Sequence, residues 1–172
     1  MSRIVVAGVA SLQITVPIRG FPIEPDPTGY PQWVRAEVCG TGASVAGALQ
    51  ALGDEVRFCT VVGRDAAGTA IRTELARLGL DGSAVAEAPV SSLGVALVAP
   101  DGRRAAFAYP AGSDSVAFPP EQFVLAARDA DLAVVSTTVF AGPLLPFAVA
   151  MGIPVAVDVH MIGDLDDPYD RP

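Results

Sequence analysis

The sequence has no apolar run long enough to cross a membrane. Its apolar stretches, such as residues 4–9 and 132–135, are far shorter than the roughly 20 residues that a transmembrane helix needs. The N-terminus also lacks the basic start and long apolar segment of a secretory signal peptide. These absences predict a cytoplasmic protein that has no membrane partner.

Basic residues are scarce as well. The 172 residues include 11 Lys and Arg against 19 Asp and Glu, which gives a formal net charge of −8. The basic residues are scattered, and Arg103-Arg104 is the only adjacent pair. Because binding to nucleic-acid phosphates needs clustered cations, the sequence predicts no nucleic-acid partner.

Cysteine and histidine are too rare to suggest a metal centre. Cys39 and Cys59 stand among apolar or small residues without metal-ligand spacing, which predicts two buried free thiols. His160 is the only histidine, and it is more typical of a polar loop residue than of a ligand. The sequence also lacks the Gly-x-Ser-x-Gly elbow of α/β-hydrolases and the phosphate-binding P-loop, which argues against both classes.

Hydrophobic residues, by contrast, make up 51% of the chain, enough to bury a core in one domain. Strand-like runs alternate with helical patterns, which predicts an α/β fold with a parallel sheet flanked by helices. Asp65 is placed to cap a helix and Gly79 to end it. The predicted strands of the main sheet are residues 3–9, 55–62, 131–136 and 154–159, and the predicted helices are residues 42–52, 66–78, 119–128 and 142–151.

Two segments interrupt this alternation. Residues 12–38 contain five prolines between β-prone pieces, and residues 92–109 read as a hairpin around Pro100-Asp101-Gly102. We expect them to pair into a small second sheet that buries its aromatic side chains against another copy of the chain. The alternative is that they pack on the main sheet. The aromatic residues concerned are Trp33, Phe107 and Tyr109.

A glycine turn at residues 39–42 runs straight into an alanine-rich helix. Gly40 and Gly42 let the backbone approach a ligand closely, and the free N–H groups at the helix start can hold a hydroxyl or an anion. In a parallel sheet, ligands collect at the carboxyl ends of the strands. This turn is therefore the first candidate for a binding site.

The order of these motifs resembles the N-terminal part of the ribokinase, or pfkB-type, family of carbohydrate kinases. The glycine turn matches the family's Gly-Gly-x-Gly-x-Asn-x-Ala segment. The resemblance implies a ribokinase-like (Rossmann-like) sheet with a small β lid over residues 1–162, and a tail at residues 163–172. The other motifs that carry it are Ile4-Val5-Val6-Ala7-Gly8, residues 61–68, residues 94–98 and Ala111-Gly112-Ser113-Asp114.

The same resemblance implies that half of the family fold is missing. The family's Gly-Ala-Gly-Asp motif, which carries the catalytic base, has no equivalent here, although residues 111–114 and 161–164 share letters with it. We therefore expect the sugar-binding portion of an enzyme that transfers the γ-phosphoryl group of ATP to a sugar or nucleoside. Alone this portion would be inactive, because it carries no catalytic residue, and we assign it no bound ATP or Mg²⁺. The alternative is a non-catalytic small-molecule binding or assembly module.

The resemblance also implies a set of substrate-binding residues. Two depart from the family pattern: Gln13 stands where an Asp is usual, and Ser44 stands where the glycine motif has Asn. A neutral amide forms weaker hydrogen bonds to hydroxyls than a carboxylate does, so both departures suggest an altered pocket. The hydroxyls of residues 136–138 are further candidates. The full set is Ser11, Gln13, Gly40, Thr41, Gly42, Ser44, Ala96, Tyr109 and Asp158.

Overall fold

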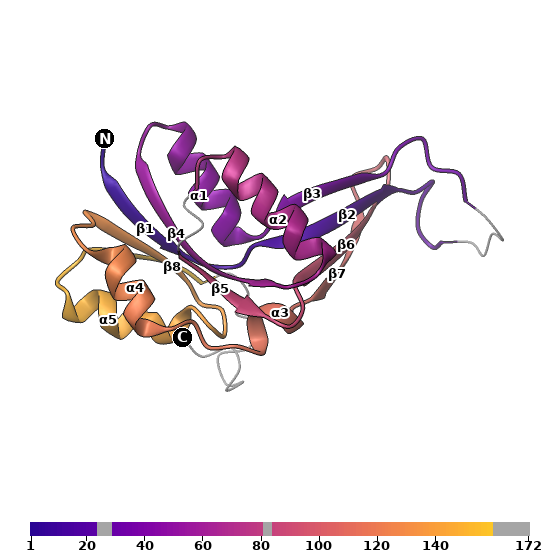
Figure 1. Ribbon diagram of the computed structural model, residues 1–172. Helices are drawn as coiled ribbons and strands as arrows, with labels where there is room; N and C mark the ends of the chain where they lie inside the picture. The colour runs from indigo at the N-terminus through magenta and orange to yellow at the C-terminus, as the bar shows by residue number, and fades with distance from the viewer. Residues whose placement is uncertain (24–28, 81–83, 160–172) are drawn as a thin grey trace.

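The computed structural model describes residues 1–23, 29–80 and 84–159 and contains two sheets (Figure 1). The main sheet has five parallel strands in the order β5-β4-β1-β8-β9. This arrangement confirms the parallel sheet predicted from the sequence. The strands are β1 (Arg3–Ala7), β4 (Glu55–Gly63), β5 (Val85–Ala88), β8 (Leu132–Ser136) and β9 (Val155–Asp158).

Helices cover both faces of the main sheet. Figure 1 shows α1 (Thr41–Ala51) and α2 (Ala66–Arg77) on one face, and α4 (Pro120–Ala127) and α5 (Leu145–Ala150) on the other. Alternate residues of each strand point to opposite faces, so Val6 packs toward α1 and α2 whereas Val5 packs toward α4 and α5. Burial on both faces explains why the strands read as apolar runs without alternation.

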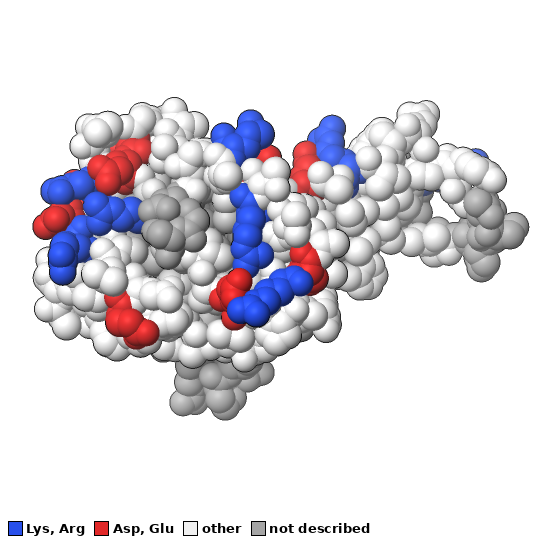
Figure 2. Space-filling model, viewed as in Figure 1, with Lys and Arg blue, Asp and Glu red and all other residues white. Residues whose placement is uncertain are grey.

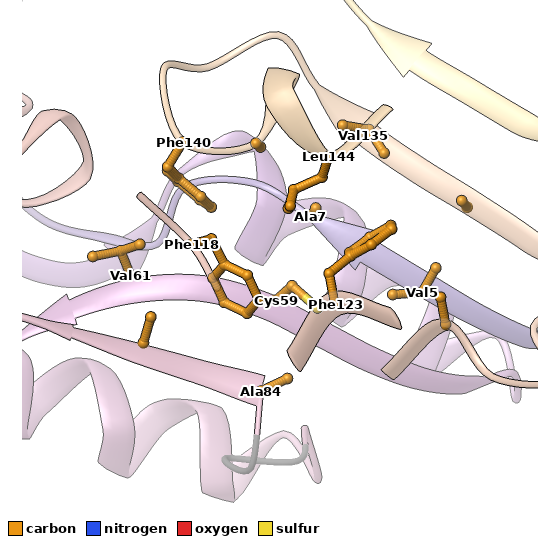
Figure 3. Close-up of a cluster of buried hydrophobic side chains, with 14 of the residues drawn as sticks. Val5, Ala7, Cys59, Val61, Ala84, Phe118, Phe123, Val135, Phe140 and Leu144 are labelled. Carbon is orange, nitrogen blue, oxygen red and sulfur yellow. The ribbon is translucent and has the colours of Figure 1, made fainter. Parts of the chain in front are cut away.

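Aromatic side chains fill the core on the α4 and α5 face. Phe118, Phe123 and Phe140 are buried there against Val5, Cys59 and other strand residues (Figure 3). None of the three belongs to a strand, so the cover of this face depends on α4 and on the segments beside it. None of the described helices is long and apolar enough to cross a membrane.

Four more strands form a separate small sheet, in the order β3-β2-β6-β7. β2 pairs parallel to β6, and the other two pairs are antiparallel. Figure 1 shows this sheet extending away from the carboxyl ends of the main strands. The predicted second sheet is confirmed, and the alternative of packing into the main sheet is wrong. Its strands are β2 (Ser11–Pro17), β3 (Arg35–Cys39), β6 (Ser92–Val98) and β7 (Arg104–Tyr109).

The two faces of the small sheet differ in character. Residues opposite each other on paired strands share a face, so Ile14, Val95 and Phe107 lie together on an apolar face. Near the main body, Leu12 extends this face into the cluster below α1 and α2. Farther out it is uncovered: Phe107 is 62% exposed and Val95 is 41% exposed. The opposite, polar face carries Ser11, Gln13, Thr15, Arg35, Glu37 and Ser92.

Some predicted elements differ from the structure. Residues 85–88 form β5, which the sequence analysis missed because Val-Ala-Glu-Ala is short and has only one β-branched residue. Pairing with Thr60–Gly63 makes it a strand. The expected helix at 142–151 is instead a 3-10 turn, η2 (Gly142–Leu144), followed by α5. Residues Ala111–Asp114 form a short helix, α3, that was not expected.

The predicted helix boundaries are mostly confirmed. Asp65 caps α2 by accepting a hydrogen bond from the Gly68 N–H at 2.7 Å. Gly79 follows the helix in a left-handed conformation, φ +70°. Pro119 and Pro120 stand at the start of α4, as predicted. The candidates His160 and residues 161–164, and the predicted tail at 163–172, lie outside the described residues.

Candidate functional site

The candidate site is built on a contact between two glycines. A side-chain carbon at Gly8, which follows β1, would lie 2.8 Å from the Gly42 Cα; one at Gly42 would lie 2.7 Å from the Gly8 Cα. No real Cβ atom tolerates such distances, so both positions need glycine. The contact brings the start of α1 against the carboxyl end of the central strand β1, where ligands bind in open α/β sheets.

The first turn of α1 has free hydrogen-bond donors. Gly40, at φ +106°, turns the chain into the helix without a side-chain cap, and the first turn holds no acidic residue. The Ala43 N–H donates to the Val9 carbonyl at 3.2 Å. The N–H groups of Thr41 and Gly42 have no partner among the described residues. They can therefore donate to an oxygen of a ligand.

Hydroxyl and carboxylate groups extend this site across the neighbouring strands. The Thr41 Oγ1 lies 3.3 Å from the Oγ of Ser136, at the end of β8. Ser136 in turn donates to the Asp158 Oδ2, at the end of β9, at 3.4 Å. The structure thus brings together two predicted residues, Thr41 and Asp158, through a serine that the sequence offered as a further candidate. Its hydroxyls can donate or accept and its carboxylate accepts, so the row can form hydrogen bonds with the hydroxyls of a polyol.

Ser11 and Gln13 lie on the polar face of the small sheet, as the binding hypothesis requires. Ser11 is directly opposite Cys39, the first residue of the glycine turn. The Gln13 Nε2 donates to the Thr15 Oγ1 at 3.2 Å. The Gln13 Oε1 accepts no hydrogen bond from the described residues. This amide therefore presents a neutral acceptor on the polar face.

The remaining predicted site residues are not all brought together. Ala96 lies on the polar face opposite Thr15, but it is only 4% exposed. Tyr109 pairs with Leu93 and so lies on the apolar face, away from Gln13. Ser44 is exposed on α1, and its hydroxyl makes no hydrogen bond to a described residue. The Ser44 hydroxyl therefore makes no bond to the nearby backbone of the described chain.

The sequence analysis overlooked two charged residues of the polar face. Arg35 and Glu37 form an ion pair, Nε to Oε1 at 3.5 Å, on the same face as Gln13. Arg35 also lies over the ring of Trp33, 5.4 Å from its centroid. The alternation of β3 could have revealed both residues once the strand was placed. They add opposite charges beside the amide of Gln13.

The two cysteines are free, as predicted, but only one is fully buried. Cys59 is 0% exposed, and burial raises its pKa to about 12. Cys39 is half-buried, which corrects the prediction of two buried thiols. Partial burial and, to a smaller extent, the negative charge of Glu37 raise the Cys39 pKa. Both thiols are therefore protonated at neutral pH and are poor nucleophiles.

The charges of the surface do not suggest a polyanionic ligand. Figure 2 shows acidic and basic side chains interspersed on the visible face, with no continuous basic patch. No group of three His, Cys, Asp or Glu residues in the described ranges could hold a metal ion. The site at the carboxyl edge is lined instead by backbone N–H groups, hydroxyls, the Asp158 carboxylate and the Gln13 amide, which can hydrogen-bond a neutral polyol.

These features define an α/β protein of the doubly wound class, with a candidate small-molecule site at the carboxyl edge of its parallel sheet and a small sheet projecting beside it. Residues 1–151 match the model of the pfkB family carbohydrate kinases. Since the match covers most of the chain, the protein belongs to the pfkB family. No curated protein sequence matches it.

Solved structures of sugar and nucleoside kinases share the fold. A microbiome-derived acarbose kinase superposes with a TM-score of 0.86 at 22% identity, covering 98% of this chain and 56% of its own. Arabidopsis thaliana ribokinase, complexed with ribose and ATP, gives 0.77 at 20% identity, covering 98% and 55%. Burkholderia thailandensis nucleoside kinase, in complex with inosine, gives 0.67 at 20%, covering 90% and 52%. The chain thus spans about half the length of these proteins.

Proposed function

We propose that this chain is the sugar-binding portion of an ATP-dependent carbohydrate kinase, which transfers a phosphoryl group to a hydroxyl of a sugar or nucleoside. The observation that carries the proposal is the glycine contact between Gly8 and Gly42. It places the free N–H groups of α1 beside the row of Thr41, Ser136 and Asp158. The family match and the nucleoside- and sugar-kinase neighbours support the same reading.

In this proposal each group of the site has a distinct role. The N–H groups of Thr41 and Gly42 donate to one substrate oxygen, and the hydroxyl row orients a second. Gln13 accepts from a substrate hydroxyl through its free Oε1 while Thr15 fixes its amide nitrogen. Because an amide carries no charge, its hydrogen bond to the substrate is weaker than that of a carboxylate. The small sheet therefore holds the substrate less tightly than it would with an aspartate at position 13.

The described residues hold no acidic cluster that could bind a Mg²⁺ ion without a nucleotide, and their acidic side chains at the site are limited to Asp158 and the paired Glu37. The glycine-rich anion hole and the catalytic aspartate that the family resemblance implies are also missing from the sequence. We therefore assign no step of phosphoryl transfer to this chain, and we expect it to be inactive alone.

The second candidate is a non-catalytic module that binds a small molecule on the same fold. It is favoured by the neutral Gln13 and by the shorter side chain of Ser44. Activity separates the two candidates only for a longer protein that includes the second half of the fold. For the 172-residue chain, the first candidate predicts binding without turnover. Sugar-dependent ADP production by the chain itself, lost on Asp158→Asn, would contradict its assignment as a binding portion.

Binding can be tested directly with three probes taken from the neighbours: D-ribose, inosine and acarbose. We expect saturation-transfer NMR to show that at least one binds. Thr41→Val should weaken it because the hydroxyl row loses a member. Thr73→Val is the matched control, since the Thr73 hydroxyl bonds only within α2, to the Thr69 carbonyl at 2.8 Å. No binding by any probe, or equal weakening in both variants, would overturn the site.

We also propose that the apolar face of the small sheet forms a homodimer interface. Phe107 and Tyr109 are 62% and 55% exposed, and Leu93 and Val95 lie beside them on the same face. A small sheet with one uncovered apolar face is only marginally stable in water, and a second copy would cover it. The polar face stays free for substrate in such a dimer.

Sedimentation velocity at tens of micromolar protein tests this interface. We expect a dimer that Phe107→Arg converts to a monomer, since the charge would enter the apolar contact. Ala108→Arg places the same charge on the neighbouring residue of β7 but on the opposite face, so it should leave the dimer intact. A monomeric parent chain, or a dimer that tolerates Phe107→Arg, would refute the proposal.

A further inference from the structure

A buried polar network ties the small sheet to the main body at one crossing of the chain. Residues 89–91 lead from β5 of the main sheet into β6 of the small sheet. The Asp65 carboxylate accepts the Ser91 N–H at 2.8 Å and the Ser91 hydroxyl at 2.6 Å. The same hydroxyl accepts the Gly63 N–H at 3.1 Å. Ser91 is 0% exposed, so its bond from Gly63 is shielded from water, whereas the bonds to the half-buried Asp65 are only partly shielded.

The backbone around this crossing is packed as closely as glycine allows. A side-chain carbon at Gly63 would lie 2.7 Å from the Val90 Cα. One at Gly112, in α3, would lie 2.7 Å from the Ser92 N and 2.9 Å from the Ser91 carbonyl carbon. The crossing is thus enclosed by the end of β4 on one side and by α3 on the other.

The second connection between the two sheets, from β7 to α3, is held by hydrogen bonds at the same place. β7 leaves the small sheet and enters α3, where the Ser113 N–H donates to the Ser92 hydroxyl at 3.2 Å. The Ser92 hydroxyl donates to the Ser113 Oγ at 3.3 Å, and both residues are buried. The start of β6 and the segment that follows β7 are therefore hydrogen-bonded to each other, and the residue before β6 is hydrogen-bonded to the main body.

Asp65 makes more bonds than a helix cap needs. Capping α2 uses only the bond from the Gly68 N–H, whereas the two bonds from Ser91 serve another segment. These Ser91 bonds, the hydroxyl first, are the main causes that hold the Asp65 pKa below its ordinary value of 3.8. The carboxylate thus stays ionised and forms the stronger, charge-assisted kind of hydrogen bond.

We propose that Asp65 is a positioning residue that holds the start of β6 against the main sheet through its two hydrogen bonds to Ser91, which we call the clamp. The clamp fixes the angle between the two sheets. The clamp acts on the backbone of residue 91 and touches no group of the candidate site. It would hold the small sheet in this way whether or not a sugar binds. Loss of the clamp frees the small sheet to move while the main sheet keeps its core.

Hydrogen exchange measured by NMR or mass spectrometry on the full chain tests the clamp. Asp65→Ser keeps a short side-chain oxygen that can cap α2, but it cannot reach Ser91 as the carboxylate does. Ser91→Ala is the milder variant, since it removes only the hydroxyl and keeps the Ser91 N–H. Thr69→Ala is the control: its hydroxyl bonds the Asp65 carbonyl in the first turn of α2 and has no part in the clamp.

We expect Asp65→Ser and Ser91→Ala to speed the exchange of β2 and β6 amides about tenfold or more, as loss of a charge-assisted hydrogen bond does. Amides of β1 and β4 should be unchanged apart from the Gly63 N–H, which loses its acceptor in Ser91→Ala, and Thr69→Ala should affect only α2. If both variants leave the small sheet as protected as in the parent chain, the clamp does not exist. Equal loosening of both sheets would show that Asp65 serves global stability alone.

Discussion

Gly42→Ala is the sharpest perturbation that the structure offers, because α1 carries its own control at Gly47. A methyl group at position 42 would lie 2.7 Å from the Gly8 Cα and 2.7 Å from the Gly8 carbonyl oxygen. Both are backbone atoms, so no rotation of a side chain can relieve the clash. At Gly47 the added methyl group meets only the Leu78 Cδ1, at an ordinary 3.7 Å.

The two substitutions should therefore change stability in opposite directions. Replacing a helical glycine with alanine stabilises by about 0.5–1 kcal/mol, and this is the whole effect at Gly47. At Gly42 the overpacking costs about 3 kcal/mol, so a net loss of about 2 kcal/mol remains. For a chain of this size the Tm should fall by roughly 4–8 °C in Gly42→Ala and rise by roughly 1–4 °C in Gly47→Ala.

Urea unfolding followed by far-UV circular dichroism measures this difference. We expect about 3 kcal/mol between the two variants in the free energy of unfolding. Gly47→Ala should still bind whichever of ribose, inosine and acarbose the parent chain binds, whereas Gly42→Ala should lose that binding. If Gly42→Ala is as stable as Gly47→Ala, the start of α1 does not pack on Gly8, and the geometry proposed for the site is wrong.

Three further predictions follow from single contacts. A thiol reagent at neutral pH should label only Cys39 in the folded chain, because burial holds the Cys59 thiol protonated and inaccessible; labelling of both in intact-mass analysis would contradict this. Arg57→Ala should lower the free energy of unfolding by about 1–2 kcal/mol, since Arg57 donates to two carbonyls at the end of α4, and urea titration measures the loss. The pKa of Asp65 is lowered, so the stabilisation of the folded state by its carboxylate is complete above pH 3.8 and is lost as the pH falls through the lowered pKa. Asp65→Asn should therefore make the free energy of unfolding less dependent on pH at the acid end.

The sequence by itself determined the class of fold and the frame of the site. Alternating apolar runs and helical patterns predicted the parallel sheet. Local chemistry placed the caps, since Asp65 needs only a helix that begins at the next residue and an N–H three residues on. Gly40 and Gly42 marked the candidate binding turn by their pattern before a helix, although the contact that requires glycine at position 42 is with the distant Gly8. The hairpin at 92–109 followed from its own turn residues.

Tertiary structure alone decided which residues face the site and which strand completes the sheet. β5 is a strand because β4 offers it hydrogen bonds, not because of its own propensity. Tyr109 and Ala96 lie on opposite faces of the small sheet, since a shift of one residue in register exchanges the faces. The row joins Thr41 to Ser136, 95 positions away, and Ser136 to Asp158, 22 positions farther on. Only the pairing of β8 with β1 and β9 brings them into contact. Such contacts depend on how distant segments pack, which local sequence does not specify.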